Sequence, residues 1–154
     1  MLNKIVSGGQ TGADRAALDA GIELGFPVGG YCPAGRLAED GEIDARYPLT
    51  ELGGGYRQRT RKNVDISHGT VIFYDSAPHG GTEQTLAFCM QFHKPYKLID
   101  ISLVGCGLAS KVICDFIENH HIAVLNVAGP RQSSCPAIYA YVKEVIKNAI
   151  KQSD

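Results

Sequence analysis

Three apolar segments of this chain each lead into a glycine-bearing turn, and each turn leads into a helix-forming stretch. The apolar segments are residues 4–7, 70–74 and 122–127, and the turns are residues 8–14, 79–85 and 128–134. Strands that alternate with helices in this order build a parallel sheet with helices on both of its faces. The nearly continuous apolar run at 70–74 is typical of a strand that is covered on both sides. The order of segments therefore predicts an α/β fold with a mostly parallel sheet.

The rest of the chain follows the same alternation. Helices are predicted at residues 13–24, 57–67, 86–92, 110–119 and about 136–151, and further strands at 28–31 and 96–101. Residues 33–56 are rich in glycine and proline and are predicted to be irregular, and a loop of that length in a compact domain is usually functional. A length of 154 residues, of which 44% are hydrophobic, suits a single domain over residues 1–154.

Charge and cysteine content restrict the partners and the compartment that we expect. The formal net charge of -1 argues against a nucleic-acid coat or an anionic-membrane binder. Residues 1–20 lack the features of a signal peptide, and no apolar stretch is long enough to cross a bilayer. The cysteines are scattered, lack zinc-site spacing and fit free thiols in a reducing compartment. We therefore expect a cytoplasmic protein with no nucleic-acid partner, no membrane partner and no metal bound by its own side chains.

The three glycine-bearing turns share a position that suits an anion. In a doubly wound sheet the turns after parallel strands meet at the carboxyl edge, where ligands bind. Each turn opens a helix, whose unpaired N–H groups and dipole favour a phosphate-sized anion. The first turn reads Gly-Gly-Gln-Thr-Gly, so it matches neither the Walker A pattern nor the dinucleotide pattern G-x-G-x-x-G. A phosphorylated ligand is favoured, and a purely structural use of the glycines is the alternative.

The candidate contacts to this ligand are glycines and polar side chains of the turns, together with arginines. They are Gly8, Gly9, Gln10, Thr11, Gly12 and Asp14 in the first turn, Gly80, Gly81, Thr82 and Thr85 in the second, Gly129, Arg131 and Ser133 in the third, and Arg36 in the long loop. Basic side chains of the helix at 57–67 are further candidates for phosphate contact: Arg57, Arg59, Arg61 and Lys62. Arg57 and Arg61 share one face of this helix, and a solvated basic face is the alternative. Cys32 and Cys135, each followed by proline, are open candidates for ligand contact.

Two carboxylates are candidates for acid/base chemistry. Asp75 ends an apolar strand beside the expected ligand edge, and Glu83 lies in the second turn, where it also suits the helix dipole. His79, next to Gly80, is the one histidine that we place at the site. The sequence pattern leaves open whether the protein carries its ligand or cuts it.

These residues together resemble a known family. The start at 8–14, the Gly-Gly-Thr turn at 80–82 and the segment at 126–131 are similar to the molybdenum cofactor carrier proteins, which are related to the YpsA-like and lysine-decarboxylase-like (LOG) Rossmannoid superfamily. The match covers nearly the whole chain. The resemblance implies a Rossmann-like three-layer αβα sandwich, a homo-oligomer (dimer or tetramer) and a phosphate-bearing ligand. In carrier members that ligand is the molybdenum cofactor, held as cargo, and the expected partner is a recipient molybdoenzyme.

Enzymes of the same superfamily cleave nucleoside monophosphates at the N-glycosidic bond and carry the motif P-G-G-x-G-T-x-x-E. This chain reads His-Gly-Gly-Thr-Glu-Gln-Thr at 79–85, which lacks the later glycine and places Glu83 too early to match the catalytic glutamate. The resemblance therefore favours a carrier that binds its ligand without catalysis. The alternatives are a nucleotide-processing hydrolase that uses Asp75 or Glu83, and a nucleotide-sensing module.

Overall fold

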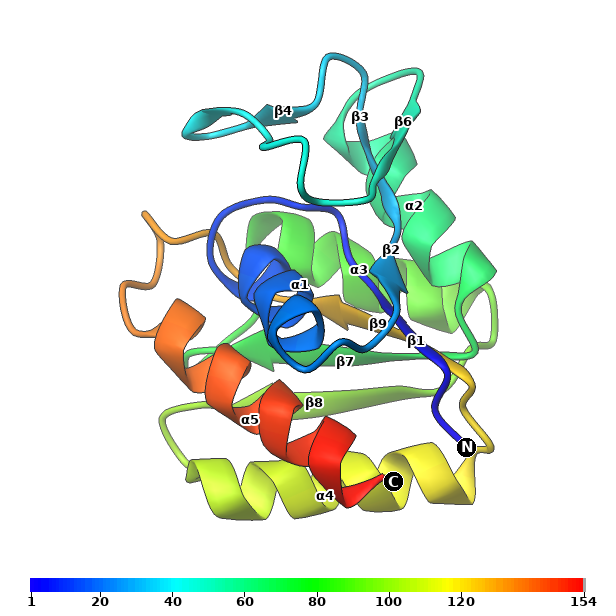
Figure 1. Cartoon of the computed structure of the whole chain (residues 1–154), viewed down its shortest axis with the longest axis vertical. Coiled ribbons are helices and arrows are strands. Elements are labelled where there is room, and N and C mark those ends of the chain that lie inside the picture. The colour runs from blue at the N-terminus through cyan, green and yellow to red at the C-terminus, as the bar shows by residue number, and fades with distance from the viewer. Residues whose placement is uncertain (154) are drawn as a thin grey trace.

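A five-stranded parallel sheet forms the centre of the molecule (Figure 1) in the computed structural model, which describes residues 1–153. Its strand order is β2-β1-β9-β7-β8, with bounds Val28–Gly29, Lys4–Val6, Val124–Ala128, Gly69–Tyr74 and Tyr96–Asp100. Neighbouring strands are parallel throughout. The chain extends the sheet outward from β1 to β2 and, on the other side, from β7 to β8. The order therefore reverses around β1, β9 and β7, where open α/β sheets bind ligands.

Helices cover both faces of this sheet (Figure 1). One face carries α1 (Ala13–Glu23), α4 (Cys106–Asn119) and α5 (Ile138–Gln152), and the other carries α2 (Tyr56–Ile66) and α3 (Gly80–Gln91). Side chains of β7 alternate between the two layers. Val71 and Phe73 join the core under α4 and α5, whereas Ile72 packs with Phe88 of α3. The predicted Rossmann-like three-layer sandwich is confirmed. None of the helices within residues 1–153 has the length and hydropathy needed to cross a membrane.

Two helices begin earlier than the sequence predicts. α3 begins at Gly80 rather than at residue 86, and α4 begins at Cys106 rather than at residue 110. Both early starts contain glycine, whose low helix propensity hid them. A first helical turn tolerates glycine, because its N–H groups lack intrahelical partners in any case. The prediction of a loop at 79–85 is therefore wrong, and its glycines form the first turn of a helix.

The segment at 33–56, predicted to be irregular, takes part in two small sheets above the main one (Figure 1). β3 (Tyr31–Pro33) pairs in parallel with β6 (Thr50–Leu52). β4 (Leu37–Ala38) pairs with β5 (Gly41–Glu42) in antiparallel orientation. Strands of two or three residues are too short to show the alternation that identifies a strand in a sequence. The prediction of an irregular segment is therefore wrong at these strands.

Arg36 stabilises this segment through hydrogen bonds to its backbone. Its guanidinium donates hydrogen bonds of 2.7–3.3 Å to four backbone carbonyl oxygens, which belong to Ile43, Asp44, Tyr47 and Leu49. Cys32 is fully buried in a small core beneath the same segment. Arg36 was predicted to contact the ligand, and Cys32 was left as an open candidate. In the structure both residues lie within the 31–52 segment, and neither lines the cavity described below.

Candidate functional site

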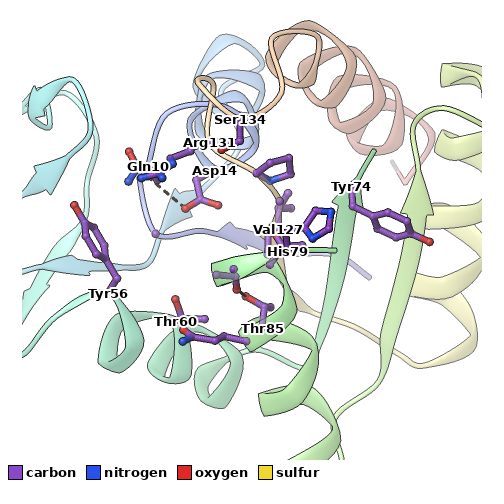
Figure 2. Close-up of a pocket in the computed structure, with 18 of the residues that line it drawn as sticks. Gln10, Asp14, Tyr56, Thr60, Tyr74, His79, Thr85, Val127, Arg131 and Ser134 are labelled. Carbon is purple, nitrogen blue, oxygen red and sulfur yellow. Dashed lines mark hydrogen bonds between the residues drawn. The ribbon is translucent and has the colours of Figure 1, made fainter. Parts of the chain in front are cut away.

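A cavity of about 530 Å³ lies where β1, β7 and β9 end, between the start of α3 and one face of α2 (Figure 2). This is the carboxyl edge of the sheet at the reversal of strand order. Small-molecule sites usually have volumes of roughly 300–1,000 Å³. The structure therefore provides a cavity of suitable size at the predicted edge.

Most of the predicted site residues line this cavity. From the turns they are Gly8, Gln10, Asp14, Gly80, Gly81, Thr82, Thr85, Gly129 and Arg131, with Asp75, His79 and Cys135 beside them. Three turns that are far apart in the sequence thus meet at one site. Their contacts with a ligand remain predictions.

Several other predicted residues lie outside the cavity wall. They are Gly9, Thr11, Gly12, Arg36, Ser133, Glu83 and Cys32. Glu83 is exposed on α3, next to the buried Thr82 that does face the cavity. Helical geometry explains this difference, because successive residues point about 100° apart around the axis. Of the two acid/base candidates, the structure thus brings Asp75 to the cavity and leaves Glu83 outside it.

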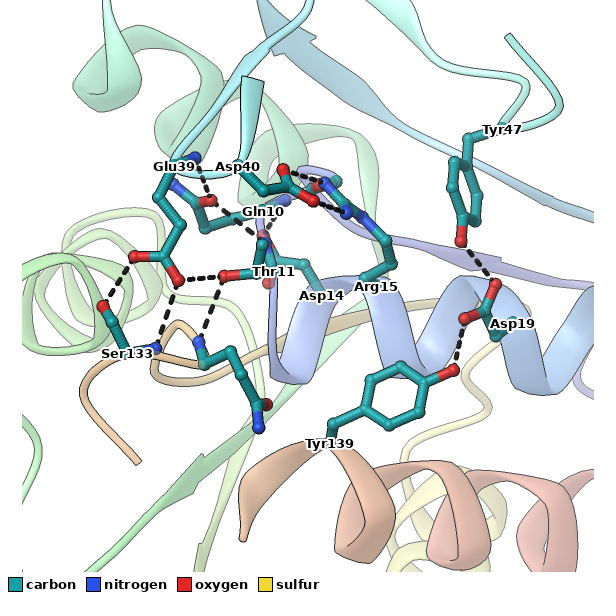
Figure 3. A network of polar contacts seen from close by, with 12 residues as sticks. Gln10, Thr11, Asp14, Arg15, Asp19, Glu39, Asp40, Tyr47, Ser133 and Tyr139 are labelled. Carbon is teal, nitrogen blue, oxygen red and sulfur yellow. Dashed lines mark hydrogen bonds and ion pairs between the residues drawn. The ribbon is translucent and has the colours of Figure 1, made fainter. Parts of the chain in front are cut away.

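Thr11 and Ser133 both donate hydrogen bonds to Glu39 rather than facing the cavity (Figure 3). The Glu39 carboxylate accepts a hydrogen bond from the Thr11 hydroxyl, and it accepts two from the Ser133 hydroxyl and amide, at 2.6 and 3.1 Å. Arg131 Nε lies 3.6 Å from the same carboxylate. The bonds from Ser133, followed by that from Thr11, hold the pKa of Glu39 below its ordinary value. Thr11 and Ser133 therefore join the first turn to the third.

The first turn uses several of its amides for acceptors within the chain. The Gln10 amide donates to Asp14 Oδ2 at 3.3 Å, and the Thr11 amide donates to Gln10 Oε1 at 3.0 Å. The Ala13 amide donates to the carbonyl oxygen of Pro130 at 3.2 Å. The Asp14 carboxylate thus lies against the start of α1, where an external anion would otherwise bind. The first turn, which was expected to bind a phosphate, therefore holds the carboxylate of its own Asp14.

The start of α3 is open by contrast. The amides of Gly80 and Gly81 find no acceptor within residues 1–153, although the next amide, that of Thr82, donates to His79 O at 3.1 Å. A Cβ built on either glycine would meet no atom within 4 Å. Both glycines line the cavity. Free N–H groups at the positive end of a helix dipole form a binding site for an anion.

Asp14 and Arg59 form an ion pair in the cavity wall. Arg59 Nη1 lies 2.9 Å from Asp14 Oδ2, and their side chains are only 11% and 9% exposed. Burial raises the pKa of Asp14, and the charge and hydrogen bond of Arg59 oppose that rise. A Cβ on Gly8 would come within 1.6 Å of Arg59 Nη1. Glycine at position 8 therefore makes room for the guanidinium.

Helix α2 supplies a wall of the cavity, of which the sequence proposed only Arg59 as a ligand contact. Its contributions are Tyr56, Arg59, Thr60 and Asn63. These residues recur three or four positions apart, which is the spacing of one helix face and the signal that could have found them. Arg57 and Arg61 share another face and point toward α3. Their guanidinium groups lie 4.9 and 5.0 Å from the ring centroids of Phe88 and Phe92.

Asp75 reaches the cavity from the end of β7, beside a residue in an uncommon backbone conformation. Ser76 has a left-handed φ of 69°. Its hydroxyl donates to Asp75 Oδ1 at 3.1 Å, and its amide donates to Asp100 Oδ1 at 3.0 Å. The hydroxyl of Ser102 also donates to Asp100 and holds the pKa of that carboxyl below its ordinary value. Asp100, at the end of β8, therefore fixes the loop that presents Asp75.

Comparisons with known proteins agree with this geometry. The sequence model of the circularly permutated YpsA SLOG family matches residues 5–150. A crystal structure from Syntrophus aciditrophicus SB, named "Putative molybdenum carrier protein", superimposes with a TM-score of 0.94 at 42% sequence identity. The alignment covers 97% of this chain and 95% of that one. No curated protein matches the sequence. Both matches point to the family that the glycine-bearing turns predicted.

Proposed function

Because the chain belongs to the circularly permutated YpsA SLOG family, we propose that it carries the molybdenum cofactor or a related phosphorylated pterin or nucleotide. The similarity to a protein named as a molybdenum carrier, over 97% of this chain, supports that class of cargo. The cavity at the carboxyl edge binds the anionic ligand, shields it from solvent and releases it unchanged. The protein in this proposal acts by binding rather than by catalysis.

The observation that carries the proposal is the open start of α3. The free amides of Gly80 and Gly81 and the helix dipole supply the contacts that a phosphate group needs. Arg131 lines the same cavity, and its side chain is 57% exposed. It can turn from Glu39 toward a phosphate and add a charge-assisted hydrogen bond. Backbone and arginine together therefore suit the phosphate of the cargo.

The metal of such a cargo requires no side-chain ligands from the protein. Within residues 1–153, no three His, Cys, Asp or Glu side chains are grouped as a metal site. In the molybdenum cofactor the metal is held by the dithiolene of the pterin itself. The cavity thus needs to bind only the organic part and its phosphate.

Retention of released cofactor tests this function. The protein is incubated anaerobically with molybdenum cofactor released from a molybdoenzyme and is then passed through a desalting column. We expect cofactor to elute with the protein and to be oxidised more slowly than free cofactor. Gly81→Val should abolish retention, because its side chain would fill the anion site. Gly107→Val is the matched control: Gly107 is the second residue of α4, as Gly81 is of α3, and has the same open surroundings.

Three results of this experiment separate the alternatives. Retention by the wild type and by Gly107→Val, but not by Gly81→Val, supports the carrier. Absence of retention and of protection contradicts it. A parallel assay of nucleoside monophosphates for turnover tests the hydrolase, for which Asp75 is the acid/base candidate that lines the cavity. Turnover that Asp75→Asn abolishes would replace the carrier by the enzyme. Thermal stabilisation by a nucleotide without turnover would instead favour a sensing module.

Self-association and delivery to a recipient molybdoenzyme remain predictions of the family resemblance. Light scattering on the purified protein distinguishes a monomer from a dimer or a tetramer. Transfer is measured by mixing the loaded carrier with a cofactor-free molybdoenzyme and following recovery of its activity. A monomer, or a recipient that gains no activity beyond that given by free cofactor, would contradict the respective prediction.

A further inference from the structure

The cavity holds a second polar feature, the Asp14–Arg59 pair, at a distance from the start of α3. Asp14 lies at the start of α1, which follows β1, and α3 follows β7. The sheet order places β9 between these two strands. Two strand spacings correspond to about 10 Å. Asp14 and the open amides of α3 can therefore contact different parts of one ligand.

The Asp14–Arg59 pair is a poor site for phosphate. The charge of Arg59 is compensated by the carboxylate at 2.9 Å, and the carboxylate repels a second anion. The phosphate therefore belongs at the amides of Gly80 and Gly81. The pair is left to contact an uncharged part of the same ligand.

The pair has unused hydrogen-bonding capacity. A carboxylate has about four acceptor positions and a guanidinium five donors. Within the chain, Asp14 Oδ2 accepts from the Gln10 amide and from Arg59 Nη1. Arg59 Nη2 has no acceptor among residues 1–153, and Arg59 Nε is buried without a partner. Both residues line the cavity, so an acceptor and a donor stand side by side in its wall.

Building on the function proposed above, we propose that this pair selects the 2-amino-4-oxopyrimidine edge that guanine and pterins share. That edge presents a carbonyl oxygen next to a ring N–H and an exocyclic amino group. The ring N–H and the amino group donate to Asp14, and the carbonyl oxygen accepts from Arg59. Tyr56 lies on the same wall, is 48% exposed and has the Arg59 guanidinium 5.6 Å from its ring centroid, so it provides an aromatic surface for the heterocycle beside the pair. Figure 2 shows Asp14, Tyr56 and Thr60 around this part of the cavity.

This arrangement discriminates against other heterocycles with the same phosphate. Adenine places a donor where guanine has its carbonyl oxygen, so it faces Arg59 with the wrong polarity. Xanthine replaces the amino group by a second carbonyl oxygen, which Asp14 repels. Hypoxanthine lacks the amino group and loses one hydrogen bond to a charged acceptor. A lost bond of that kind weakens binding roughly tenfold or more.

Calorimetric titration of the full chain at pH 8 with GMP, IMP, XMP, AMP and ribose 5-phosphate tests the selection. The wild type should bind GMP roughly tenfold more tightly than IMP, and XMP and AMP more weakly still. Asp14→Asn should bind XMP better than GMP, because the amide NH₂ group donates where the carboxylate accepts. Asp19→Asn is the matched control on the same helix: its carboxylate is bound by Tyr47 and Tyr139 outside the cavity, and we expect the wild-type order. 6-Hydroxymethylpterin phosphate distinguishes a pterin site from a guanine site.

Each outcome decides between the two proposals. Equal affinity for all four nucleotides and ribose 5-phosphate leaves the phosphate site intact and overturns the selection of the edge. Preference of the wild type for AMP or XMP also overturns it, whether or not Asp14→Asn folds. Failure of every probe to bind, ribose 5-phosphate included, contradicts the phosphate site and the inference that builds on it. Preference for the pterin phosphate over GMP keeps the inference and assigns it to pterins.

Discussion

The starts of α1 and α3 look alike in the sequence and differ in the structure. Each has a pair of glycines followed closely by threonine, and each helix follows a strand of the same parallel sheet. At α1 the Gln10 amide donates a hydrogen bond to the Asp14 carboxylate, and Arg59 donates a second hydrogen bond to the same carboxylate. At α3 the amides of Gly80 and Gly81 have no acceptor within residues 1–153. Of the two glycine pairs, only Gly80 and Gly81 both line the cavity with amides that lack an acceptor in the described part of the chain.

Glycine is needed at the two helix starts for different physical reasons. A Cβ on Gly12 would lie 2.4 Å from the carbonyl oxygen of Pro130, and its φ is +81°. A Cβ on Gly81 would meet no atom within 4 Å. The first glycine is required by packing and backbone conformation, and the second keeps a cavity open. Gly12 is therefore needed for the fold, whereas Gly81 leaves space for a ligand.

The largest effect should come from breaking the ion pair beside α1. Arg59→Met should lower the free energy of unfolding by about 3–5 kcal/mol at pH 8, because it leaves the buried Asp14 carboxylate without its partner. Urea unfolding followed by circular dichroism measures this loss. The double variant Arg59→Met with Asp14→Asn should recover most of it, since the buried charge is then removed. A loss below about 1 kcal/mol in the single variant would show that Asp14 does not depend on Arg59.

Alanine at one glycine of each start tests the comparison directly. Gly12→Ala should lower the free energy of unfolding by about 2–3 kcal/mol, because it combines a strained φ with a backbone clash. Gly81→Ala should change it by less than about 1 kcal/mol, since alanine suits a helix and finds open space. Binding of a phosphorylated ligand should fall only in Gly81→Ala among variants that remain folded. Equal destabilisation by the two changes would contradict the distinction.

The dependence of stability on pH should differ between the wild type and Asp14→Asn. The folded-state pKa of Asp14 is raised by burial above its ordinary value of 3.8. The folded state therefore binds its proton more tightly than the unfolded state. The resulting contribution to stability is fully present below the unfolded-state pKa and is lost as the pH rises through the folded-state value. Melting temperatures from pH 4 to pH 8 should thus show the variant gaining stability relative to the wild type. A constant difference would contradict the raised pKa.

The smallest effect should come from the contact that joins the first turn to the third. Glu39→Gln should lower the free energy of unfolding by about 1 kcal/mol, through weaker bonds to the hydroxyls of Thr11 and Ser133. The pKa of Glu39 is lowered in the folded state, so its contribution is present above the unfolded-state pKa and is lost as the pH falls through the folded-state value. Wild type and variant should therefore converge in melting temperature at acid pH. A difference that grows on acidification would contradict this role.

The sequence predicted the sheet and the meeting of the three turns at one edge, because both follow from the order in which strands and helices alternate along the chain. Apolar runs such as 70–74 identify buried strands, and parallel strands bring the turns after them to one edge. The comparisons confirmed the family that the turns suggested. The use of each turn could not be predicted, because it depends on partners far along the chain. Arg59 lies 45 positions after Asp14, and Glu39 lies 94 positions before Ser133.

The face of α2 that lines the cavity escaped prediction for a related reason. The sequence shows a basic helix at 57–67, and the choice between its faces depends on how α2 packs against α3. Arg57 lies over the ring of Phe88, which turns Arg59 to the cavity. The short strands at 31–52 were missed because two or three residues show no alternation, and Arg36 fixes the residues between these strands from a distance along the chain. Local patterns predict elements, whereas the roles of single side chains depend on tertiary contacts.

Amide chemical shifts show directly whether the start of α3 binds the anion and the start of α1 does not. The experiment records ¹H–¹⁵N spectra of the labelled protein during titration with ribose 5-phosphate, with Gly81→Val as the control. We expect large, saturable shifts at Gly80 and Gly81, small ones at Gln10, Thr11 and Ala13, and no shifts of either kind in the control. Saturable shifts centred on Gln10 and Thr11, with Gly80 and Gly81 unmoved, would contradict it.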